Sequence, residues 1–277
     1  MHPVVNHLIQ LQELQLIRDE QRVTAKGKSL TELDASIKTM TANLPAETRV
    51  LYTKLQKRDH ISVTTVRDSM CTGCGLLLAI SFVQQVRMEK EILTCPNCSR
   101  VLYNPERIIR RMEKGPRRVA TRKPGLSRFS SHSLIIPRLK AKTKEEAILE
   151  LATSMAEVGF VDNAENMTAE ALARESVLST AVDHGMAFPH VRGIDGGGLS
   201  LALGLSPKGI NFDNDGPLSK IIFLISIPTA ASAFYLKLLA GLMETFRQAE
   251  ARKTLMAEND PEKVWKTLIK LTRTTIK

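Results

Sequence analysis

The sequence predicts a multidomain α+β protein, in which a helical hairpin and a four-cysteine module precede an α/β domain with a mixed sheet flanked by helices. Three observations lead to this fold class. Apolar residues recur at helical spacing through residues 4–55, all four cysteines fall within residues 71–98, and apolar strands alternate with helices after residue 133. Strands that are apolar along their whole length indicate a sheet covered on both faces.

Composition and charge support a division into domains and exclude several classes of protein. The chain has 277 residues and is 43% hydrophobic, which excludes disordered and fibrous proteins and, at ~150 residues per domain, predicts one or two domains. Residues 1–140 hold 24 Lys and Arg against 12 Asp and Glu, whereas residues 141–277 hold 15 against 17. This asymmetry separates a basic N-terminal half from a nearly neutral C-terminal half.

The apolar runs of the chain are too short for a helix that spans a bilayer. The longest, residues 76–80 and 199–205, fall well below the ~20 residues that such a helix needs. The start Met1-His2-Pro3 is not a basic segment followed by an apolar one, as a secretory signal would be. We therefore expect a soluble cytoplasmic protein without a membrane span, in a reducing compartment.

Two amphipathic helices are predicted near the N-terminus, over residues 4–22 and 30–44. The second has the spacing of a coiled-coil seam, formed by Leu30, Leu33, Ile37, Met40 and Leu44. Ser29 and Glu32 form a predicted capping box at its start. Two heptads are too short for a long coiled coil, so we expect an antiparallel hairpin that turns near residues 26–28. A core-facing helix without a partner is the alternative.

The cysteines form two C-x-x-C pairs separated by twenty residues: Cys71, Cys74, Cys95 and Cys98. At this spacing two tight turns can bring four thiolates to one tetrahedral Zn²⁺, and four protein ligands would make that zinc structural. A redox dithiol pair and an iron–sulfur cluster are the alternatives. Gly75 follows the first pair, where the turn favours a residue able to adopt positive φ, and Ser99 takes the equivalent place after the second.

Residues 4–105, roughly, resemble a bacterial family in which a coiled coil carries a four-cysteine zinc ribbon. The resemblance rests on the helical hairpin, on Cys-x-x-Cys-Gly, on a short β-hairpin expected between the pairs, and on the run C-P-N-C-x-R-x-L-Y at residues 95–103. Members of that family are described as binding nucleic acids or protein partners. The resemblance therefore implies a binding role for this part of the chain.

A basic stretch follows the second cysteine pair. Ten Lys and Arg residues between residues 100 and 128 are opposed by only Glu106 and Glu113. Such a stretch can neutralise nucleic-acid phosphates, and a solvated linker is the alternative. We divide the chain into a helical hairpin at 1–68, the zinc ribbon with a basic helix at 69–113, a basic linker at 114–132 and a C-terminal domain at 133–277.

The C-terminal domain shows apolar strands and capped helices in alternation. Thr143 and Glu146 form a predicted capping box at the start of its first helix. Strands are predicted at residues 134–136, 199–205 and 221–227, and further helices around residues 169–173, 232–247 and 261–272.

His190 is the candidate reactive residue of this domain. It ends a short apolar segment bounded by a glycine and a proline, and Arg174 and Thr180 can supply hydrogen-bond donors for a phosphate. Neutral imidazole keeps one unprotonated nitrogen and can act as a nucleophile toward phosphorus. An ordinary core or surface histidine is the alternative for His190, and we interpret His184 as a surface residue.

Residues ~133–277 resemble the enzyme IIA domain of the bacterial phosphoenolpyruvate-dependent sugar phosphotransferase system, of the fructose/mannitol and nitrogen-regulatory type. The motifs are L-x-R-E-x-x-x-S-T at residues 172–180 and G-x-A-x-P-H at residues 185–190, and residues 204–212 resemble the next strand and loop. The resemblance implies that His190 accepts a phosphoryl group from a histidine phosphocarrier protein and that Arg174 supports the phosphate. Tyr235 stands where that family commonly has a second histidine.

Together these features predict a regulator that is reversibly phosphorylated on His190 and fused to a structural zinc ribbon. Its expected partners are the phosphocarrier protein, a protein effector or permease domain, and nucleic acid through basic residues 100–128. One alternative is an ordinary sugar phosphotransfer component. The other is a zinc-ribbon protein that binds nucleic acid or protein and whose second domain no longer transfers phosphate.

Overall fold

The computed structural model describes residues 3–24, 30–58, 61–88, 90–104, 125–192, 199–213, 216–228 and 231–276. The chain divides into two compact units, Met1–Ile109 and Arg110–Lys277, and each is described by itself. Within these ranges, every helix is too short or too polar to cross a bilayer. The predicted hairpin turn at 26–28, Ser29 and most of the basic stretch lie outside the described residues.

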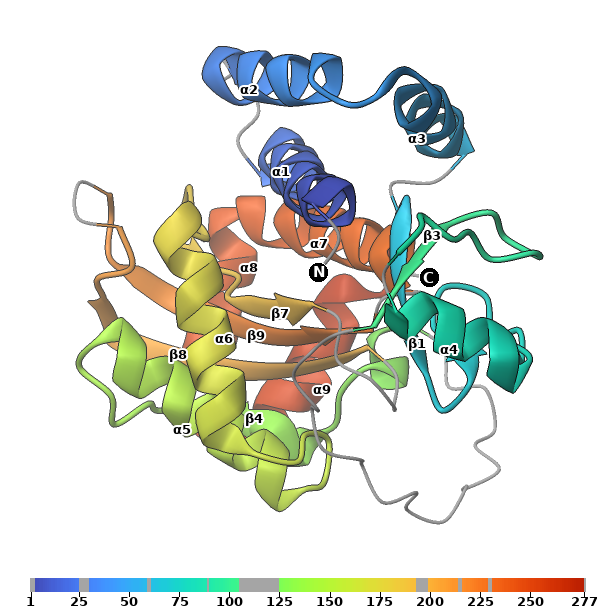
Figure 1. Cartoon of the computed structure of the whole chain (residues 1–277). Helices are drawn as coiled ribbons and strands as arrows, with labels where there is room; N and C mark the ends of the chain where they lie inside the picture. Colours follow the sequence, from blue (N-terminus) through green and yellow to red (C-terminus); the bar gives the residue numbers. More distant parts are fainter. Residues whose placement is uncertain are drawn as a thin grey trace. The chain divides into compact units, whose positions relative to one another are not determined.

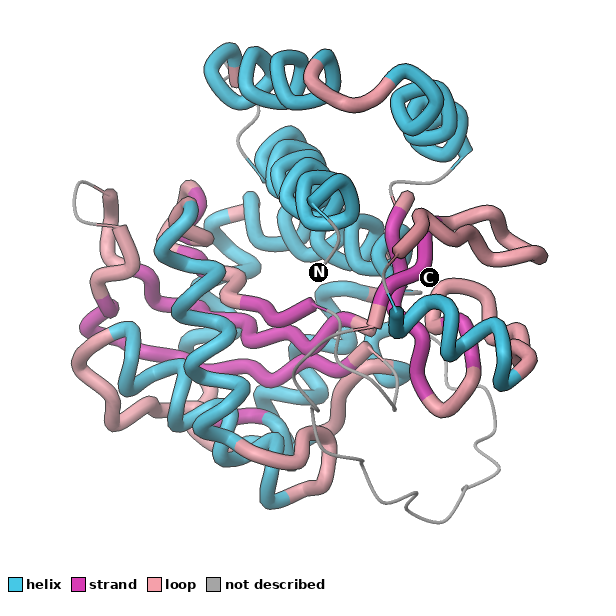
Figure 2. Tube along the Cα trace, in the orientation of Figure 1, coloured by secondary structure: helices cyan, strands magenta, loops and turns pink. Residues whose placement is uncertain are grey.

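The N-terminal unit begins with three helices (Figures 1 and 2), α1 (Pro3–Thr24), α2 (Thr31–Ala42) and α3 (Ala46–Arg58). Leu8 and Leu11 of α1 lie in one apolar cluster with Ile37 and Leu44, so the predicted seam packs against α1 within the chain. The predicted capping box is wrong. α2 has Leu30 at its N-cap position, which puts Glu32 one residue too early for its carboxylate to reach back to the cap.

The rest of this unit is a small sheet of β1 (Val63–Arg67), β2 (Met70–Cys71) and β3 (Val101–Tyr103). β1 lies in the middle, antiparallel to β2 and parallel to β3. The β-hairpin expected between the cysteine pairs is wrong, because this segment contains helix α4 (Ile80–Met88). Val83 and Val86 lie one turn apart on α4 and pack in the same buried cluster as the cysteines, which favours the helix.

Gln12 connects α1 to this sheet. Its Oε1 accepts hydrogen bonds from the backbone N–H groups of Ser62 and Val63 at 2.7 and 2.8 Å, and its Nε2 donates to the carbonyl of Val63 at 3.3 Å. The side-chain amide therefore pairs with the start of β1 much as a neighbouring strand would. These part-buried hydrogen bonds tie the helical part of the unit to its sheet, beside the apolar cluster that the two parts share.

The C-terminal unit contains a mixed sheet, as predicted. Its strands are β4 (Ile135–Ile136), β5 (Ala181–Val182), β6 (Met186–Ala187), β7 (His190–Arg192), β8 (Ser200–Ile210) and β9 (Ser219–Ile227). The order is β4-β8-β9-β6-β5, and β7 also pairs with β9. The β8–β9 and β5–β6 pairs are antiparallel, whereas β4, β6 and β7 each run parallel to their neighbour in β8 or β9.

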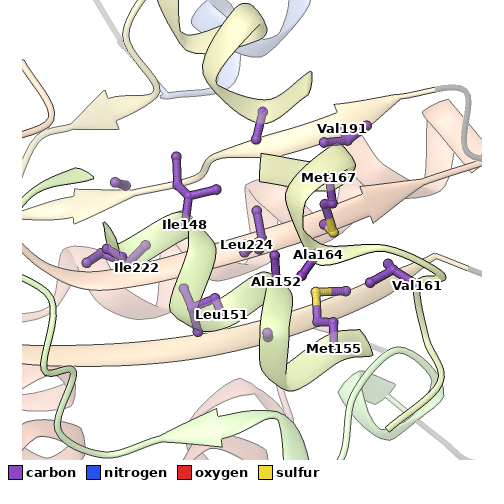
Figure 3. Packing of buried hydrophobic residues seen from close by; sticks show 14 of the residues in the cluster. Ile148, Leu151, Ala152, Met155, Val161, Ala164, Met167, Val191, Ile222 and Leu224 are labelled. Carbon is purple, nitrogen blue, oxygen red and sulfur yellow. The ribbon is translucent and has the colours of Figure 1, made fainter. Parts of the chain in front are cut away.

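Helices cover both faces of this sheet, as Figure 1 shows, with α5 (Lys144–Glu157) and α6 (Ala164–Val177) on one face and α7 (Ser232–Arg247), α8 (Ala249–Ala257) and α9 (Pro261–Thr272) on the other. The first face is seen in Figure 3, where Ile148 and Met155 of α5 and Met167 of α6 lie with Leu224 of β9 in one buried cluster. The Thr143–Glu146 capping box that starts α5 is confirmed. Helix α8 was not predicted as a separate element.

The described part of the C-terminal unit begins before its predicted boundary. Two short 3-10 helices, η1 (Gly125–Arg128) and η2 (His132–Leu134), precede β4. Leu126 is buried, and the carbonyl of Phe129 accepts a hydrogen bond from the N–H of Leu201 at 2.8 Å. This end of the predicted linker is therefore packed against the sheet. The sequence did not predict this packing, because the few apolar residues here stand among basic ones.

Candidate functional site

Two equivalent tight turns hold the cysteine pairs. The N–H of Gly75 donates to the carbonyl of Cys71, and the N–H of Ser99 donates to the carbonyl of Cys95, each at 2.8 Å. Both residues that close the turns have a positive φ, +76° at Gly75 and +61° at Ser99. The prediction that Gly75 supplies a positive φ is confirmed, and Ser99 adopts the same conformation without the freedom of glycine.

The four sulfurs lie close enough together to bind one metal ion. All four Sγ atoms are within 4.8 Å of one another, and the Cys71–Cys98 and Cys74–Cys95 sulfurs are 3.7 and 3.6 Å apart. Tetrahedral zinc thiolates have Zn–S distances of about 2.3 Å, which separates their sulfurs by about 3.8 Å. The residues therefore fit Zn²⁺. Four thiolate ligands leave no coordination position for a substrate, so this zinc is structural.

Burial and hydrogen bonding shift the pKa values of Cys71, Cys74 and Cys95 in different directions. Burial raises the pKa of Cys71 and of Cys95 above the ordinary value for a thiol. Cys74 is the most exposed of the four. Burial acts to raise its pKa too, but hydrogen bonds from the backbone of Leu76 and the side chain of Asn97 lower the pKa of Cys74 to about 6. Since Zn²⁺ binds thiolates, filling the site displaces protons from the cysteines and makes metal binding depend on pH.

Two arginines donate hydrogen bonds to backbone carbonyls of the cysteine turns. Arg100 donates from Nε to the carbonyl of Ile61 at 3.0 Å and from Nη1 to the carbonyl of Gly73 at 3.1 Å. Arg58, at the end of α3, donates to the carbonyl of Cys98. Both cysteine turns are thus attached to the segment that leads into β1, so residues outside the C-x-x-C pairs help to set the metal geometry.

His190 opens β7, and hydrogen bonds fix the orientation of its ring. Nδ1 lies 2.9 Å from the carbonyl oxygen of Phe188 and 3.3 Å from the hydroxyl oxygen of Tyr235. A carbonyl oxygen can only accept a hydrogen bond, so Nδ1 carries the proton in the neutral ring. The lone pair is then on Nε2, which is the nitrogen able to act as a nucleophile.

Tyr235 of α7 contacts His190 directly. The two ring centroids are 5.2 Å apart and the rings are tilted by 39°, and the Tyr235 side chain is buried. Arg192, two residues further along β7, places its guanidinium carbon 5.0 Å from the centre of the Tyr235 ring. Tyr235 was noted in the sequence as a departure from the family motif, whereas Arg192 was not predicted. The period of two along a strand, which puts residues 190 and 192 on one face, was the available signal.

Arg174 and Thr180 lie on either side of the turn that follows α6. Arg174 donates from Nη1 to the carbonyl of Leu178 at 2.8 Å. The hydroxyl and N–H of Thr180 both donate to the carboxylate of Glu175, at 2.6 and 2.8 Å. The carbonyl of Thr180 accepts from the N–H of Phe188 at 3.1 Å. Thr180 therefore reaches the segment before the histidine through its backbone, while its hydroxyl is held by Glu175.

Glu175 is a second residue that sequence reasoning missed. Its side chain is buried, and its carboxylate also accepts a hydrogen bond from the hydroxyl of Ser179 at 3.1 Å. The sequence motif could have indicated this role, because Glu175 stands four residues before Ser179 and five residues before Thr180. Glu175 thus fixes the turn that carries Thr180 to the strands beside His190.

Comparisons with known proteins match a part of each unit to a known family. The family described as "Phosphoenolpyruvate-dependent sugar phosphotransferase system, EIIA 2" matches residues 128–271, and the "C4-type zinc ribbon domain" matches residues 70–102. The nitrogen regulatory protein of Bradyrhizobium diazoefficiens is 32% identical over 138 residues, which cover 48% of this chain and 88% of that protein. The fructose-specific EIIABC component of Bacillus subtilis is 28% identical over 119 residues, which cover 43% of this chain and 19% of that protein.

Among solved structures, the nitrogen regulatory protein IIA-Ntr from Neisseria meningitidis is 23% identical, with a TM-score of 0.47 over 51% of this chain and 97% of that chain. The EIIA match spans more than half of the 277 residues and includes His190, Tyr235 and the whole six-stranded sheet. The chain carries a C4-type zinc ribbon and belongs to the EIIA 2 family of the phosphoenolpyruvate-dependent sugar phosphotransferase system.

Proposed function

We propose that this protein is a regulator that accepts a phosphoryl group on His190 from a histidine phosphocarrier protein. The observation that carries the proposal is the orientation of the His190 ring, whose Nδ1 faces the carbonyl of Phe188 inside the region of the EIIA match. Nε2 then keeps its lone pair for attack on phosphorus. The similarity to a nitrogen regulatory protein and to a fructose-specific EIIABC component supports phosphotransfer chemistry.

The proposed transfer moves one phosphoryl group between two imidazole rings. The Nε2 lone pair of His190 attacks the phosphorus of the carrier's phosphohistidine, and a new P–N bond forms. The old P–N bond breaks, and its electron pair returns to the carrier's ring. His190 keeps its Nδ1 proton, so positive charge appears on its ring as charge leaves the ring of the carrier. The carbonyl of Phe188, 2.9 Å from Nδ1, stabilises that charge.

Arg174 and Thr180 have different proposed roles in this step. A guanidinium suits the oxygens of a phosphoryl group, and we assign Arg174, in the last turn of α6, to that contact. Thr180 acts through its backbone, because its carbonyl holds the N–H of Phe188 and so positions the segment that ends at His190. Phosphoryl exchange depends mainly on such positioning and on charge stabilisation.

The attached zinc ribbon supports a regulatory role, since it is a structural binding module joined to a phosphoryl-accepting domain. Phosphorylation of His190 would add about 1.5–2 negative charges. We propose that this charge changes the affinity of the chain for a protein effector or permease domain in the cytoplasm. Replacing His190 with alanine should abolish the difference in affinity between the treated and untreated protein.

Intact mass spectrometry tests the central claim. The full chain is incubated with phosphoenolpyruvate, enzyme I and the phosphocarrier, and wild type is compared with His190→Ala. His184→Ala is the matched control, because His184 is an exposed histidine in the turn between β5 and β6 of the same unit. An acid-labile gain of one phosphoryl group in wild type and His184→Ala, absent from His190→Ala, would support the proposal. No gain in wild type would refute it.

A second candidate function is favoured by Tyr235. A phenol cannot become cationic as histidine can, so a domain with tyrosine at this place is a candidate for lost phosphotransfer. The chain would then act through its zinc ribbon, as a nucleic-acid-binding or protein-binding protein. An unphosphorylated wild type, with a gel shift of nucleic acid by the full chain that weakens steeply as salt is raised, would support this function.

A third hypothesis is that the chain is an ordinary sugar phosphotransfer component, and the similarity to a fructose-specific component supports it. In that case the phosphorylated protein would pass its phosphoryl group to a permease domain. Growth of a deletion strain on single sugars separates the two roles. Loss of growth on one sugar would support the sugar component, and normal growth on every sugar would support the regulator.

A further inference from the structure

Arg192 shares a strand face with His190. Side chains alternate along β7, and Val191, which stands between the two, is buried in the cluster that faces α5 and α6. His190 and Arg192 therefore point to the other face, where Tyr235 contacts both. Its ring centre lies 5.2 Å from the imidazole centre and 5.0 Å from the guanidinium carbon. One buried aromatic ring thus bridges the proposed phosphoryl acceptor and an arginine.

We propose that Arg192 binds the phosphoryl group on His190 and that the ring of Tyr235 holds the guanidinium in place for this contact. The proposal rests on the proposed function, because it needs a phosphoryl group on His190. A guanidinium contacts an aromatic ring through its face, whereas its N–H donors lie in its plane and point outwards. The same group can therefore stack on Tyr235 and donate hydrogen bonds to phosphoryl oxygens.

Arg192 supplies the positive charge that Tyr235 lacks. Tyrosine offers one hydroxyl donor and no positive charge, while a phosphoryl group brings about 1.5–2 negative charges. The guanidinium of Arg192 brings positive charge together with planar N–H donors that suit phosphoryl oxygens. The tyrosine in place of histidine is thus compatible with phosphotransfer, because the positive charge comes from the strand instead of from the helix.

The equilibrium constant for transfer from the phosphocarrier to the full chain tests this role. A residue that binds the phosphorylated form shifts that equilibrium, whereas a residue that only supports the fold stabilises both forms alike. Arg192→Gln should lower the equilibrium constant by about tenfold, the level expected for a hydrogen bond to a charged group. Arg192→Lys should restore part of the loss. Arg273→Gln, which removes an exposed arginine of the same unit, is the matched control and should equal wild type.

Variants of Tyr235 test whether its ring holds Arg192. Tyr235→Phe keeps the ring and loses the hydroxyl, whereas Tyr235→Leu loses both. If the ring holds the guanidinium, Arg192→Gln should lower the equilibrium constant about tenfold in the Tyr235→Phe background and by much less in the Tyr235→Leu background. Equal losses in the two backgrounds would overturn the role of the ring.

The outcomes separate this inference from the proposed function. If wild type takes up a phosphoryl group and Arg192→Gln has the same equilibrium constant as Arg273→Gln, Arg192 has no such role and the proposed function stands. If Arg192→Lys does no better than Arg192→Gln, positive charge is not what Arg192 supplies. If wild type takes up no phosphoryl group, both proposals fail. The fluorescence of Trp265 in α9, the single tryptophan of the chain, reports whether each variant keeps the C-terminal unit folded.

Discussion

Replacing Glu175 with alanine should destabilise the C-terminal unit strongly, although the residue lies outside the main apolar clusters. The carboxylate of Glu175 accepts hydrogen bonds from the N–H of Thr180 at 2.8 Å, from its hydroxyl at 2.6 Å and from the hydroxyl of Ser179 at 3.1 Å. Alanine removes both acceptor oxygens, and with them all three hydrogen bonds, at once. The turn between α6 and β5 would then lose the group that holds it.

The size of the effect follows from the donors that are left behind. Thr180 is 6% exposed, so its N–H and hydroxyl would be buried without an acceptor, at a cost of about 1–3 kcal/mol each. Ser179 loses less, because its hydroxyl also donates to the carbonyl of Phe212 at 3.2 Å. We therefore expect the free energy of unfolding to fall by about 4 kcal/mol in Glu175→Ala. Glu175→Gln keeps an amide oxygen as acceptor and should lose about 1–2 kcal/mol.

Urea unfolding followed by Trp265 fluorescence measures this loss, because the single tryptophan lies in the C-terminal unit. Glu165→Ala is the matched control, since Glu165 is an exposed glutamate in the first turn of the same helix. Its loss should stay below about 1 kcal/mol. A Glu175→Ala variant that is no less stable than Glu165→Ala would show that the three hydrogen bonds do not hold the turn.

Four further predictions concern the metal, two local conformations and pH. Removing zinc with a chelator should reduce helical circular dichroism without changing Trp265 fluorescence, because metal binding supplies folding free energy to the N-terminal unit alone. Gly75→Ala should destabilise the ribbon by about 1–2 kcal/mol. A Cβ at this position meets no atom within 4 Å, so the positive φ is the only cost. Competition with a zinc chelator measures the resulting loss of zinc affinity. Asn163→Ala should lower the unfolding free energy by about 1 kcal/mol in urea titrations, because its side chain caps α6. Backbone N–H donors of the preceding turn lower the pKa of Glu146 in the folded protein. The cap formed by Glu146 therefore stabilises α5 fully above the unfolded-state pKa of this carboxyl. That stabilisation is lost as pH falls through the folded-state pKa. Glu146→Gln should therefore weaken the acid dependence of stability.

Local rules predicted elements well where the decisive contacts lie a few residues apart. The capping box of Thr143 and Glu146 and the bounds of α7 and α9 depend on neighbouring residues, and all were found as predicted. The box at Ser29 fails because the helix begins after Leu30, one residue later than the seam pattern suggests. The helix between the cysteine pairs was missed because it is stabilised by packing against the folded ribbon, which a family pattern does not describe.

The site residues also differ in how far the sequence alone could predict them. The cysteines and His190 could be proposed from the sequence because each lies in a short local motif. Arg192 was missed because its contact with Tyr235 joins a strand to a helix far along the chain. Glu175 was missed because its role appears only once the turn after α6 closes over its carboxylate. The contact of Arg192 thus joins distant segments, whereas the contacts of Glu175 are local but form only in the closed turn.

The hydrogen bonds of Gln12 constrain the order in which the N-terminal unit can be assembled. They join a residue in the first helix to Ser62 and Val63, 50 and 51 positions further along the chain. β1 in turn pairs with β3, which follows the second cysteine pair. During synthesis α1 can pack against α2 as soon as both helices have left the ribosome, but its hydrogen bonds to β1 can form only after residues 62 and 63 have followed. Helix α1 therefore has all its partners only once β1, which carries the cysteine turns beside it, is in place.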